Sequence, residues 1–500
     1  MNALQKLNVM RQAGGSRRTV GLADATIERF LKSDPLLAQA IDEGFAAFES
    51  ARGEFAQLIG FDENAQLRAV QAGYINFYAE DAVNPYVAVS GRGPWVVTLK
   101  GAVVYDCGGY GMLGGGHAPQ EIIDAMARPQ VMANIMTPSL SHLRLDQALR
   151  REIGHTRGGC PYTRFLCLNS GSESVTLAGR LADVHTKLMT DPGGAHAGRK
   201  VRRIAVTGAF HGRTELPALY SDSSRKAYVE NLASFAHHDH TLTVEPYNVE
   251  QLRQVFADAE AKGWHIEAMF LEPVMGEGNP GRAVTPEFYA AARELTEAHG
   301  SLLLVDSIQA GLRAHGVLSI VDYPGFEGLE APDMETYSKA LNAGQYPLSV
   351  LAVGERAAAL YRKGIYGNTM TTNPRAMDVA CAVLAGLSAE LRNNIRERGA
   401  EFIRKLEALA RELPGMITAV QGTGLLLSCE LASDFKCYGA GSTEEFMREN
   451  GIGVIHGGVN SLRFTPHFNV RSDEVDLVVD GVRRALIEGP RMRQPTAQAA

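Results

Sequence analysis

Cysteine is scarce in this 500-residue sequence, which contains only six such residues. They are scattered along the chain and none forms a Cys-x-x-Cys pair, so the sequence indicates neither a zinc ribbon nor a disulfide framework. Such cysteine usage in a long chain is typical of reducing compartments. We therefore expect a cytoplasmic protein.

Long apolar runs are also missing. No uninterrupted apolar stretch approaches the length of a membrane span, and the opening residues, MNALQKLNVMRQAGG, lack the apolar core of a secretory signal. The formal net charge is only −7, from 49 basic and 56 acidic residues, which gives no electrostatic reason to expect a nucleic-acid partner. We expect neither a membrane nor a nucleic acid as partner.

The rest of the composition, with 45% hydrophobic and 21% charged residues, is that of an ordinary globular protein. We expect four regions along the chain. Residues 1–90 contain amphipathic segments such as LLAQAIDEGFAAFESARGEFAQL and form a helical extension that packs in part with a small domain. Residues 91–375 form a large domain that opens with a hairpin at WVVTLKGAVVYDCG. Residues 376–490 form the smaller α+β domain, and residues 491–500 a frayed tail.

The large domain alternates apolar strands with amphipathic helices. The expected strands are TRFLCL, VRRIAVT, AMFLEP, SLLLVDS and SVLAVG, and two of the expected helices are SESVTLAGRLADVHTK and TPEFYAAARELTEAHG. Nearly continuous apolar strands favour a largely parallel sheet covered by helices on both faces. Ligands bind outside the carboxyl ends of such strands, so the residues that close each strand are the candidates for function.

Two motifs look like binding sites but fail on their context. Residues 109–114 spell Gly-x-Gly-x-x-Gly, yet no helix follows directly and no acidic residue closes a second strand about 20 residues on. His237, His238, Asp239 and His240 are consecutive, so they cannot easily all face one metal ion. We expect a glycine-rich loop in the first case, a solvated loop in the second, and no metal site.

Two polar segments stand where apolar strands end. In NSGSES, residues 169–174, Gly171 and Ser172 offer backbone N–H groups and a hydroxyl to an anion at the start of a helix, and a plain N-cap is the alternative. SLLLVDS ends in Asp306, with Gln309 just beyond. A buried carboxylate needs a partner such as a protonated pyridine nitrogen, unless it caps the following turn.

Two further segments complete the set. ETYSKAL places Lys339 after a short strand, where a desolvated amine attacks carbonyl groups; a surface lysine is the alternative. After VRRIAVT, Phe210 offers an aromatic face to a flat ring and Arg213 offers a guanidinium to a carboxylate. Each segment is ordinary alone, and their order across one parallel sheet makes them support one another.

With these segments the sequence resembles the class III aminotransferases, the fold-type I group that includes ornithine, acetylornithine and 4-aminobutyrate aminotransferases. The resemblance runs from about residue 85 to 485 and rests on NSGSES, AFHGRT, FLEPVMGEG, LLLVDSIQAGL, YSKAL, TMTTNP and RFTPHF, in the order of the family. It implies a fold-type I α/β protein, with a large domain of mostly parallel sheet covered by helices and a smaller α+β domain. It also implies pyridoxal 5′-phosphate as the cofactor.

The resemblance assigns roles to single residues. Lys339 matches the lysine that carries the cofactor as a Schiff base, and Asp306 the partner of its pyridine nitrogen; these two are the expected catalytic residues. The other expected cofactor contacts are Gly171 and Ser172 at the phosphate, Phe210 against the ring, Glu272 near the cofactor, Gln309 at the ring hydroxyl, and Thr369 at the phosphate of the neighbouring subunit. The role of Thr369 implies an obligate homodimer with shared active sites.

For the substrate, Arg463 matches the arginine that binds a carboxylate, and Glu277 matches the glutamate that pairs with this arginine when an ω-amine is bound. Arg213 matches a second carboxylate-binding arginine. The sequence departs from the family at Thr371 and Thr372, which stand where Gly-Gly usually precedes Asn-Pro, and at Thr176, where the family often has an acidic residue. The N-terminal extension is also longer than in compact members.

We expect a ping-pong transamination between an amino acid or ω-amino compound and a keto acid such as 2-oxoglutarate. Lys339 would act as the base that shifts a proton, while Asp306 keeps the cofactor ring cationic. Alternatives on the same scaffold are an aminomutase, an amino-acid epimerase and a decarboxylase, all of which need the same two residues. A more distant alternative is a non-catalytic binding protein.

Overall fold

The computed structural model describes residues 1–108, 110–131, 134–235 and 240–492. The chain forms two compact units. The first, which we call the terminal unit, comprises Met1–Pro119, Glu397–Gln421 and Leu427–Ala500; the second, the sheet unit, comprises Gln120–Arg396 and Gly422–Leu426. The hairpin and the glycine-rich segment before residue 120 were expected in the large domain but belong to the terminal unit. Residues 376–396 were expected in the small domain but belong to the sheet unit.

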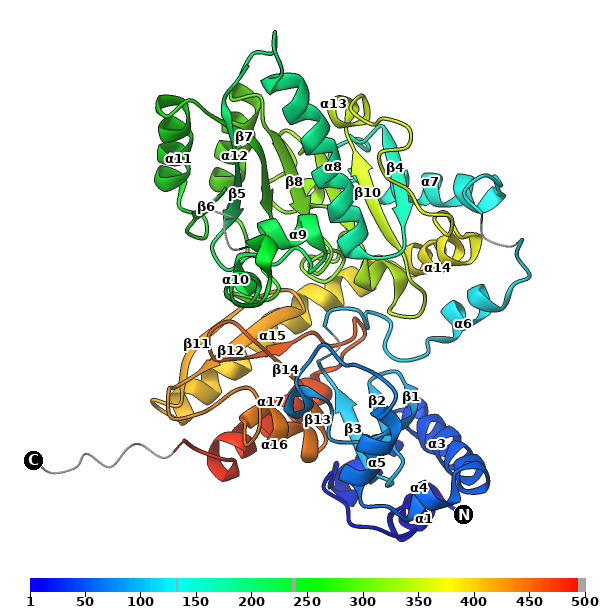
Figure 1. The fold of residues 1–500 in the computed structure, drawn as a ribbon. Coiled ribbons are helices and arrows are strands. Elements are labelled where there is room, and N and C mark those ends of the chain that lie inside the picture. The colour runs from blue at the N-terminus through cyan, green and yellow to red at the C-terminus, as the bar shows by residue number, and fades with distance from the viewer. Residues whose placement is uncertain (109, 132–133, 236–239, 493–500) are drawn as a thin grey trace, which may run out of the picture. The chain divides into compact units, whose positions relative to one another are not determined.

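A seven-stranded sheet organises the sheet unit (Figure 1), with strand order β4-β10-β9-β8-β7-β5-β6. Neighbours from β9 to β6 are parallel, whereas β10 runs antiparallel to both β4 and β9. The strands are β4 (Arg164–Leu168), β5 (Lys200–Val206), β6 (Thr241–Val244), β7 (Trp264–Leu271), β8 (Leu302–Asp306), β9 (Met334–Tyr337) and β10 (Ser349–Val353). The expected mostly parallel α/β sheet is confirmed.

Helices cover this sheet because its strands are apolar on both sides. All five residues of β8 are buried, so both of its faces need a packing partner. Helix α8 packs against β7, β9 and β10, and α11 and α12 pack against β7. The helices are α6 (Gln120–Ala127), α7 (Leu140–Glu152), α8 (Gly171–Thr190), α9 (Glu215–Tyr220), α10 (Arg225–Asn231), α11 (Val249–Ala261), α12 (Pro286–Ala298), α13 (Glu355–Ala358) and α14 (Pro374–Ala385), with 3₁₀ turns η2 (Asp222–Ser224), η3 (Ala233–Phe235), η4 (Ile320–Asp322) and η5 (Lys339–Asn342). Helix α15 (Ala389–Glu412) begins in the sheet unit and ends in the terminal unit.

The terminal unit contains two small sheets. Strand order is β1-β2-β3-β13 in one and β11-β12-β15-β14 in the other. The strands are β1 (Ala88–Arg92), β2 (Trp95–Thr98), β3 (Val103–Asp106), β11 (Ile417–Thr423), β12 (Leu426–Leu431), β13 (Ile452–Gly453), β14 (Ile455–Gly457) and β15 (Ser461–Phe464). The helices are α1 (Ala3–Arg11), α2 (Asp24–Leu31), α3 (Pro35–Glu54), α4 (Ala56–Gly60), α5 (Glu63–Gln71), α16 (Thr443–Glu449) and α17 (Ser472–Glu488), with the 3₁₀ turn η1 (Glu80–Ala82).

The expected hairpin is present as β2 and β3, with Trp95 paired to Tyr105 and Val97 to Val103. Gly101 has a φ of +71°, which a glycine adopts without steric cost, and its N–H donates to the carbonyl of Thr98. The expected helix near residues 36–58 is α3 followed by α4. Its buried residues Leu37, Ile41 and Phe48 repeat at helical spacing, as an amphipathic helix requires.

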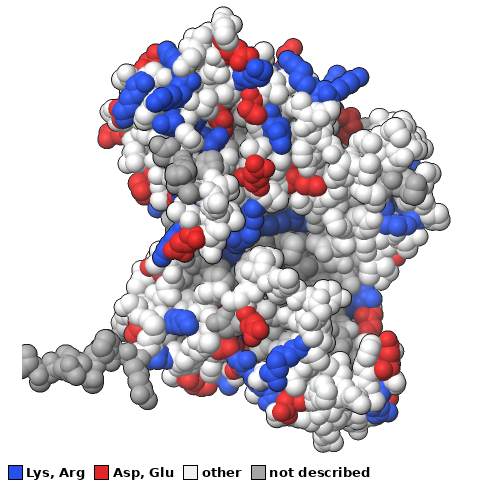
Figure 2. All heavy atoms as spheres, viewed as in Figure 1, with Lys and Arg blue, Asp and Glu red and all other residues white. Residues whose placement is uncertain are grey.

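Some expectations fall partly outside the described residues. These are Gly109 of the glycine-rich segment, three of the four consecutive polar residues (His237, His238 and Asp239), and residues 493–500 of the tail. The described helices include none long and apolar enough to cross a bilayer. On the face seen in Figure 2, basic and acidic side chains are interspersed.

A buried carboxylate ties together the strands that precede the candidate site. Glu335 of β9 is 0% exposed and accepts hydrogen bonds from the Ser307 hydroxyl, the Ser319 hydroxyl, the Tyr162 hydroxyl at 2.7 Å and the Ile320 N–H at 2.9 Å. Ser307 directly follows β8. The network therefore fixes the end of β8 against β9.

We predict that Glu335→Ala lowers the free energy of unfolding by about 3 kcal/mol, because four buried donors lose their acceptor. Urea denaturation measures the change. Glu335→Gln is the matched variant, which keeps the volume and one amide oxygen, and should lose less. An alanine variant as stable as the wild type would contradict this role.

Candidate active site

Lys339 directly follows Ser338 at the end of β9 and opens the 3₁₀ turn η5. Its φ is +48°, in the left-handed region that costs a non-glycine residue about 1–3 kcal/mol and that clusters at functional sites. Its Nζ donates to Oε1 of Gln309 at 3.0 Å. The half-buried lysine is therefore held by both its backbone and its side chain.

Asp306, the last residue of β8, is buried and hydrogen-bonded. Its Oδ2 lies 2.9 Å from Nδ1 of His211, and its Oδ1 accepts the N–H of Ile308 at 3.1 Å. His211 is itself buried, and its Nε2 finds no hydrogen-bond partner within the described part of the chain. His211 was not among the residues expected from the sequence; its position beside Phe210, after β5, was the available signal.

Helix α8 presents an open N-terminus. Ser170 and Glu173 form a reciprocal capping box, in which each side chain accepts the other's backbone N–H. Among the described residues no acceptor binds the N–H groups of Gly171 and Ser172. A Cβ on Gly171 would lie 2.6 Å from Cδ1 of Ile308, so a larger residue here would require the Ile308 side chain to move. These two N–H groups, with the helix dipole, form an anion site.

The turn after β5 reaches both the anion site and the acidic residues. A Cβ on Gly212, whose φ is +118°, would lie 2.5 Å from Oγ of Ser172, so this turn is pressed against the start of α8. The N–H of Phe210 donates to Oε2 of Glu272 at 3.1 Å. The guanidinium carbon of Arg213 lies 5.1 Å from the centre of the Phe210 ring.

Glu272 directly follows β7 and is buried. Its Oε1 accepts the N–H of Gly276 at 2.9 Å, and the Gly276 carbonyl accepts Nε2 of Gln309 at 3.4 Å. Burial, partly opposed by the nearby His211 and reinforced by the charge of Asp306, raises the pKa of Glu272 to about 7. Glu272 thus lies near the midpoint of its titration at neutral pH.

Seven of the expected residues therefore lie along one edge of the sheet, at the carboxyl ends of β4, β5, β7, β8 and β9. They are Gly171, Ser172, Phe210, Glu272, Asp306, Gln309 and Lys339. Direct contacts join Lys339 to Gln309, and the Gly276 backbone joins Gln309 to Glu272. The carboxyl edge is where ligands bind in parallel α/β sheets.

The three residues expected to bind the substrate belong to both units: Arg213 and Glu277 to the sheet unit and Arg463 to the terminal unit. Glu277 Oε1 lies 3.9 Å from Nη2 of Arg213, and Nη1 of Arg213 donates to the Ser224 hydroxyl at 3.3 Å. Arg463 is buried on β15 in the terminal unit, with its guanidinium carbon 5.6 Å from the centre of the Tyr110 ring. The expected pairing of Glu277 with Arg463 stays a prediction.

Thr369 lies on an exposed turn, beside residues that approach α8. Asn368 donates to Glu173 Oε1 at 3.0 Å and accepts Nδ2 of Asn169 at 3.3 Å, so the turn is attached near the anion site of its own chain. Thr372 has a φ of +57°, a conformation that favours glycine. A glycine at this position would adopt the same backbone conformation without strain. Thr176 is the other position that departs from the family pattern. Its hydroxyl donates to the Ser172 carbonyl and shares a hydrogen bond with the Thr214 hydroxyl.

We predict that Glu272→Gln stabilises the cofactor-free protein relative to the wild type as pH rises from about 4.3 to 7. In this window the folded wild type keeps a proton that the unfolded chain releases, so its stability falls with pH, by roughly 3 kcal/mol in total. The glutamine variant does not titrate there. Urea midpoints at pH 5 and pH 7.5 measure the difference, with Glu287→Gln on the exposed face of α12 as the matched control. Parallel curves for the wild type and Glu272→Gln would refute the raised pKa.

The family model described as aminotransferase class-III matches residues 77–486. The succinylornithine transaminase of Citrobacter koseri (strain ATCC BAA-895 / CDC 4225-83 / SGSC4696) is 31% identical over 324 residues, which cover 63% of this chain and 72% of that protein.

Solved structures share the fold. The ornithine aminotransferase from Toxoplasma gondii ME49 superposes with a TM-score of 0.71 at 22% identity, over 87% of this chain and 97% of that one. The N-acetylornithine aminotransferase from Stenotrophomonas maltophilia K279a gives a TM-score of 0.64 at 23% identity, over 84% and 98%. The expected fold-type I architecture is confirmed. Because the family model spans most of the sequence, the chain belongs to the class III aminotransferases, enzymes that use pyridoxal 5′-phosphate.

Proposed function

We propose that this aminotransferase moves an amino group from an amino acid or ω-amino compound to a keto acid such as 2-oxoglutarate, with Lys339 as the lysine that carries the cofactor. The set of contacts along the carboxyl edge of the sheet is the observation that supports this assignment. It runs from Lys339 through Gln309 and the Gly276 backbone to Glu272.

The residues present fit pyridoxal 5′-phosphate. The open N–H groups of Gly171 and Ser172 suit a phosphate, and the buried Asp306 suits a protonated pyridine nitrogen. Phe210 offers the flat face. Glycine at position 276 leaves room for Gln309, because a Cβ there would lie 2.3 Å from Gln309 Oε1. When bound, the cofactor supplies an electron sink for the carbanion formed at the amino-bearing carbon.

The protein's own groups then hold charge and move protons. Asp306, as a carboxylate, accepts Nδ1–H of His211, which fixes both the imidazole tautomer and the carboxylate orientation. Lys339 is the base that transfers a proton at the substrate carbon, and its hydrogen bond to Gln309 sets the direction of Nζ. Glu272 places a titrating carboxyl beside Asp306, so the total negative charge of the site changes near neutral pH.

For substrate recognition, Arg213 is the carboxylate-binding group that lies in the sheet unit. Glu277 at 3.9 Å partly neutralises it, so a carboxylate-bearing substrate competes with Glu277 for the guanidinium. We assign a second carboxylate to Arg463. The relatives named for succinylornithine, ornithine and N-acetylornithine support an amino acid with a side-chain amine as donor.

We further propose a cytoplasmic homodimer that shares its active sites. The edge strand β4 is flanked by a cavity of about 860 Å³, lined by residues that include Leu145, Phe165 and Thr369. Nearby Ile135, Met136, Leu140 and Leu143 are exposed apolar side chains. A second copy would cover this apolar surface and the sheet edge. The six cysteines are all free thiols, which supports a reducing compartment.

We predict that Lys339→Ala loses the visible absorbance band of the lysine-linked cofactor and at least about a thousandfold of the transamination rate. The loss follows from removing both the attachment point and the base. The assay uses ornithine, N-acetylornithine, succinylornithine and alanine as donors, each with 2-oxoglutarate and with pyruvate. Lys363→Ala, an exposed lysine of the same unit, is the control. Side-chain amine donors should exceed alanine. Retained absorbance in Lys339→Ala, or the absence of amino transfer from every donor to either keto acid, would reject the proposal.

We predict that Leu140→Asp, at the exposed start of α7, converts the dimer into a monomer and abolishes activity, because Thr369 of the other copy is lost from each site. Light scattering after gel filtration measures the mass. Leu188→Asp is the matched control, an exposed leucine near the end of α8. A wild-type protein that is monomeric and active would contradict the shared site.

A further inference from the structure

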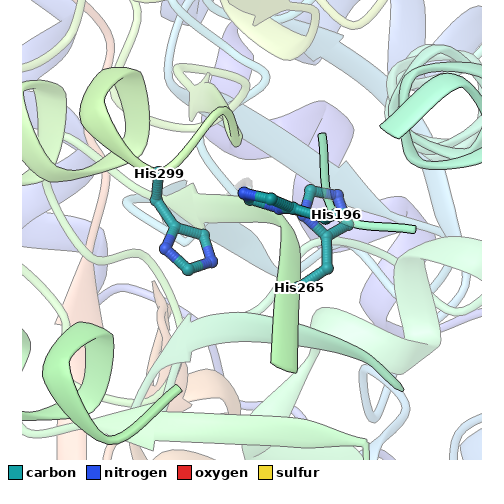
Figure 3. A group of neighbouring side chains, drawn as sticks. All are labelled: His196, His265 and His299. Atoms are coloured by element: carbon teal, nitrogen blue, oxygen red, sulfur yellow. The ribbon is translucent and has the colours of Figure 1, made fainter. Parts of the chain in front are cut away.

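Three histidines from distant parts of the sequence meet in the sheet unit (Figure 3). His196 lies in the loop after α8, His265 is the second residue of β7, and His299 caps the end of α12. One ring nitrogen from each lies within 4.8 Å of those of the other two. The ring of His196 is the nearest neighbour of both others, with centre-to-centre distances of 4.9 Å to His265 and 5.2 Å to His299.

The hydrogen bonding of these rings is incomplete. His265 is 0% exposed; its Nδ1 lies 2.8 Å from Nδ1 of His196, and its Nε2 has no partner among the residues described. Two neutral imidazoles share such a contact only if one nitrogen donates and the other accepts. Leaving a buried imidazole nitrogen without a hydrogen-bond partner costs free energy, so such a group in a native structure needs an explanation, for example a bound ion.

The third histidine is oriented by its surroundings. Nε2 of His299 accepts the Ile266 N–H over 3.3 Å, a long hydrogen bond, and Nδ1 lies 3.9 Å from Oε2 of Glu260. A carboxylate that accepts the outer N–H of a histidine orients metal ligands. Glu260 lies beyond hydrogen-bond distance of His299 but on the side of its Nδ1. In Figure 3 the His299 ring turns one nitrogen toward the other two rings.

Burial favours the neutral form of all three imidazoles. Burial lowers the pKa of His196 and of His299, and lowers that of His265 to about 3, with the neighbouring histidines adding to the effect. The other ionisable groups near the cluster are Arg199, whose two terminal nitrogens bind both oxygens of Glu260 at 2.6 and 2.8 Å, and His185, which bonds to the Gly300 carbonyl at 2.7 Å. A metal ion would take the Nδ1 lone pairs of His196 and His265 and would replace the Ile266 N–H at Nε2 of His299.

We propose that His196, His265 and His299 bind one divalent transition-metal ion of the zinc type. Imidazole nitrogens are preferred ligands of such ions, and a tetrahedral site needs its nitrogens about 3.3 Å apart. The ring nitrogens of the three residues now lie within 4.8 Å of one another, so binding requires the side chains to rotate to that spacing. An ion that accepts both Nδ1 lone pairs removes the need for a donor between His196 and His265. Glu260 is engaged by Arg199, so water takes the fourth position.

The ion would stabilise the fold and leave the chemistry unchanged. It joins the loop after α8, the start of β7 and the end of α12. Glu272 of the candidate active site follows the opposite end of β7, roughly 23 Å along the strand. Metal binding is thus expected to raise the melting temperature without changing kcat/KM.

The test uses the full-length, untagged enzyme loaded with its cofactor and freed of metal by a chelator that is then removed. Titration with Zn²⁺ in a calorimeter should show about one tight site per chain, and the melting temperature should rise with Zn²⁺. His196→Gln, in a partly exposed loop, should weaken binding at least about tenfold and remove most of the thermal shift. His155→Gln, a histidine elsewhere in the same unit, is the matched control and should bind as the wild type does.

Two results would overturn the proposal. One is the absence of a stoichiometric Zn²⁺ site in the wild-type enzyme. The other is Zn²⁺ binding of equal affinity in the wild type and in the double variant His196→Gln/His299→Gln, which would place the ion elsewhere. Unchanged kcat/KM in the metal-free enzyme would separate this site from the cofactor site.

Discussion

The candidate site depends on how the buried carboxylate of Asp306 is stabilised. A charge at the end of an apolar strand is unstable unless hydrogen bonds or an opposite charge compensate for its lost hydration. His211 and the Ile308 N–H supply hydrogen bonds, and in the proposed function the cationic ring of the cofactor would supply the opposite charge. The proposed pairing with a protonated pyridine therefore rests on the position of Asp306 in the sheet.

The neighbouring groups are fixed by the same edge of the sheet. Glu335 ties the turn after β8 to β9, and β9 leads directly to Lys339. The positive φ of Lys339 is a strain that this packing sustains. The close approach of Gly212 to Ser172 brings the anion site against the turn that carries Phe210 and His211. Rigid strands thus position groups drawn from five segments of the sequence.

The sequence predicts those site residues that stand directly at or after the ends of apolar strands. Apolar runs that stop at Asp306 or just before Gly171 place these residues at one edge of a parallel sheet, and the structure has them there. The sequence gives no comparable pattern for contacts between side chains that follow different strands. The bond from His211 to Asp306 joins residues 95 positions apart, and the proximity of Arg213 to Glu277 depends on how two turns fold. The histidine cluster was missed for the same reason, because His196, His265 and His299 have no characteristic spacing.

The boundaries of the two units could not be predicted from the sequence pattern either, because residues 1–119 belong with the C-terminal segments only through tertiary packing.

The central claim, that Lys339 carries the cofactor, has a direct test. Borohydride reduction of the cofactor-loaded enzyme fixes the cofactor covalently to its lysine, and peptide mass spectrometry then locates it. The account predicts one modified peptide, with the cofactor on Lys339. A cofactor fixed to any other lysine would contradict it.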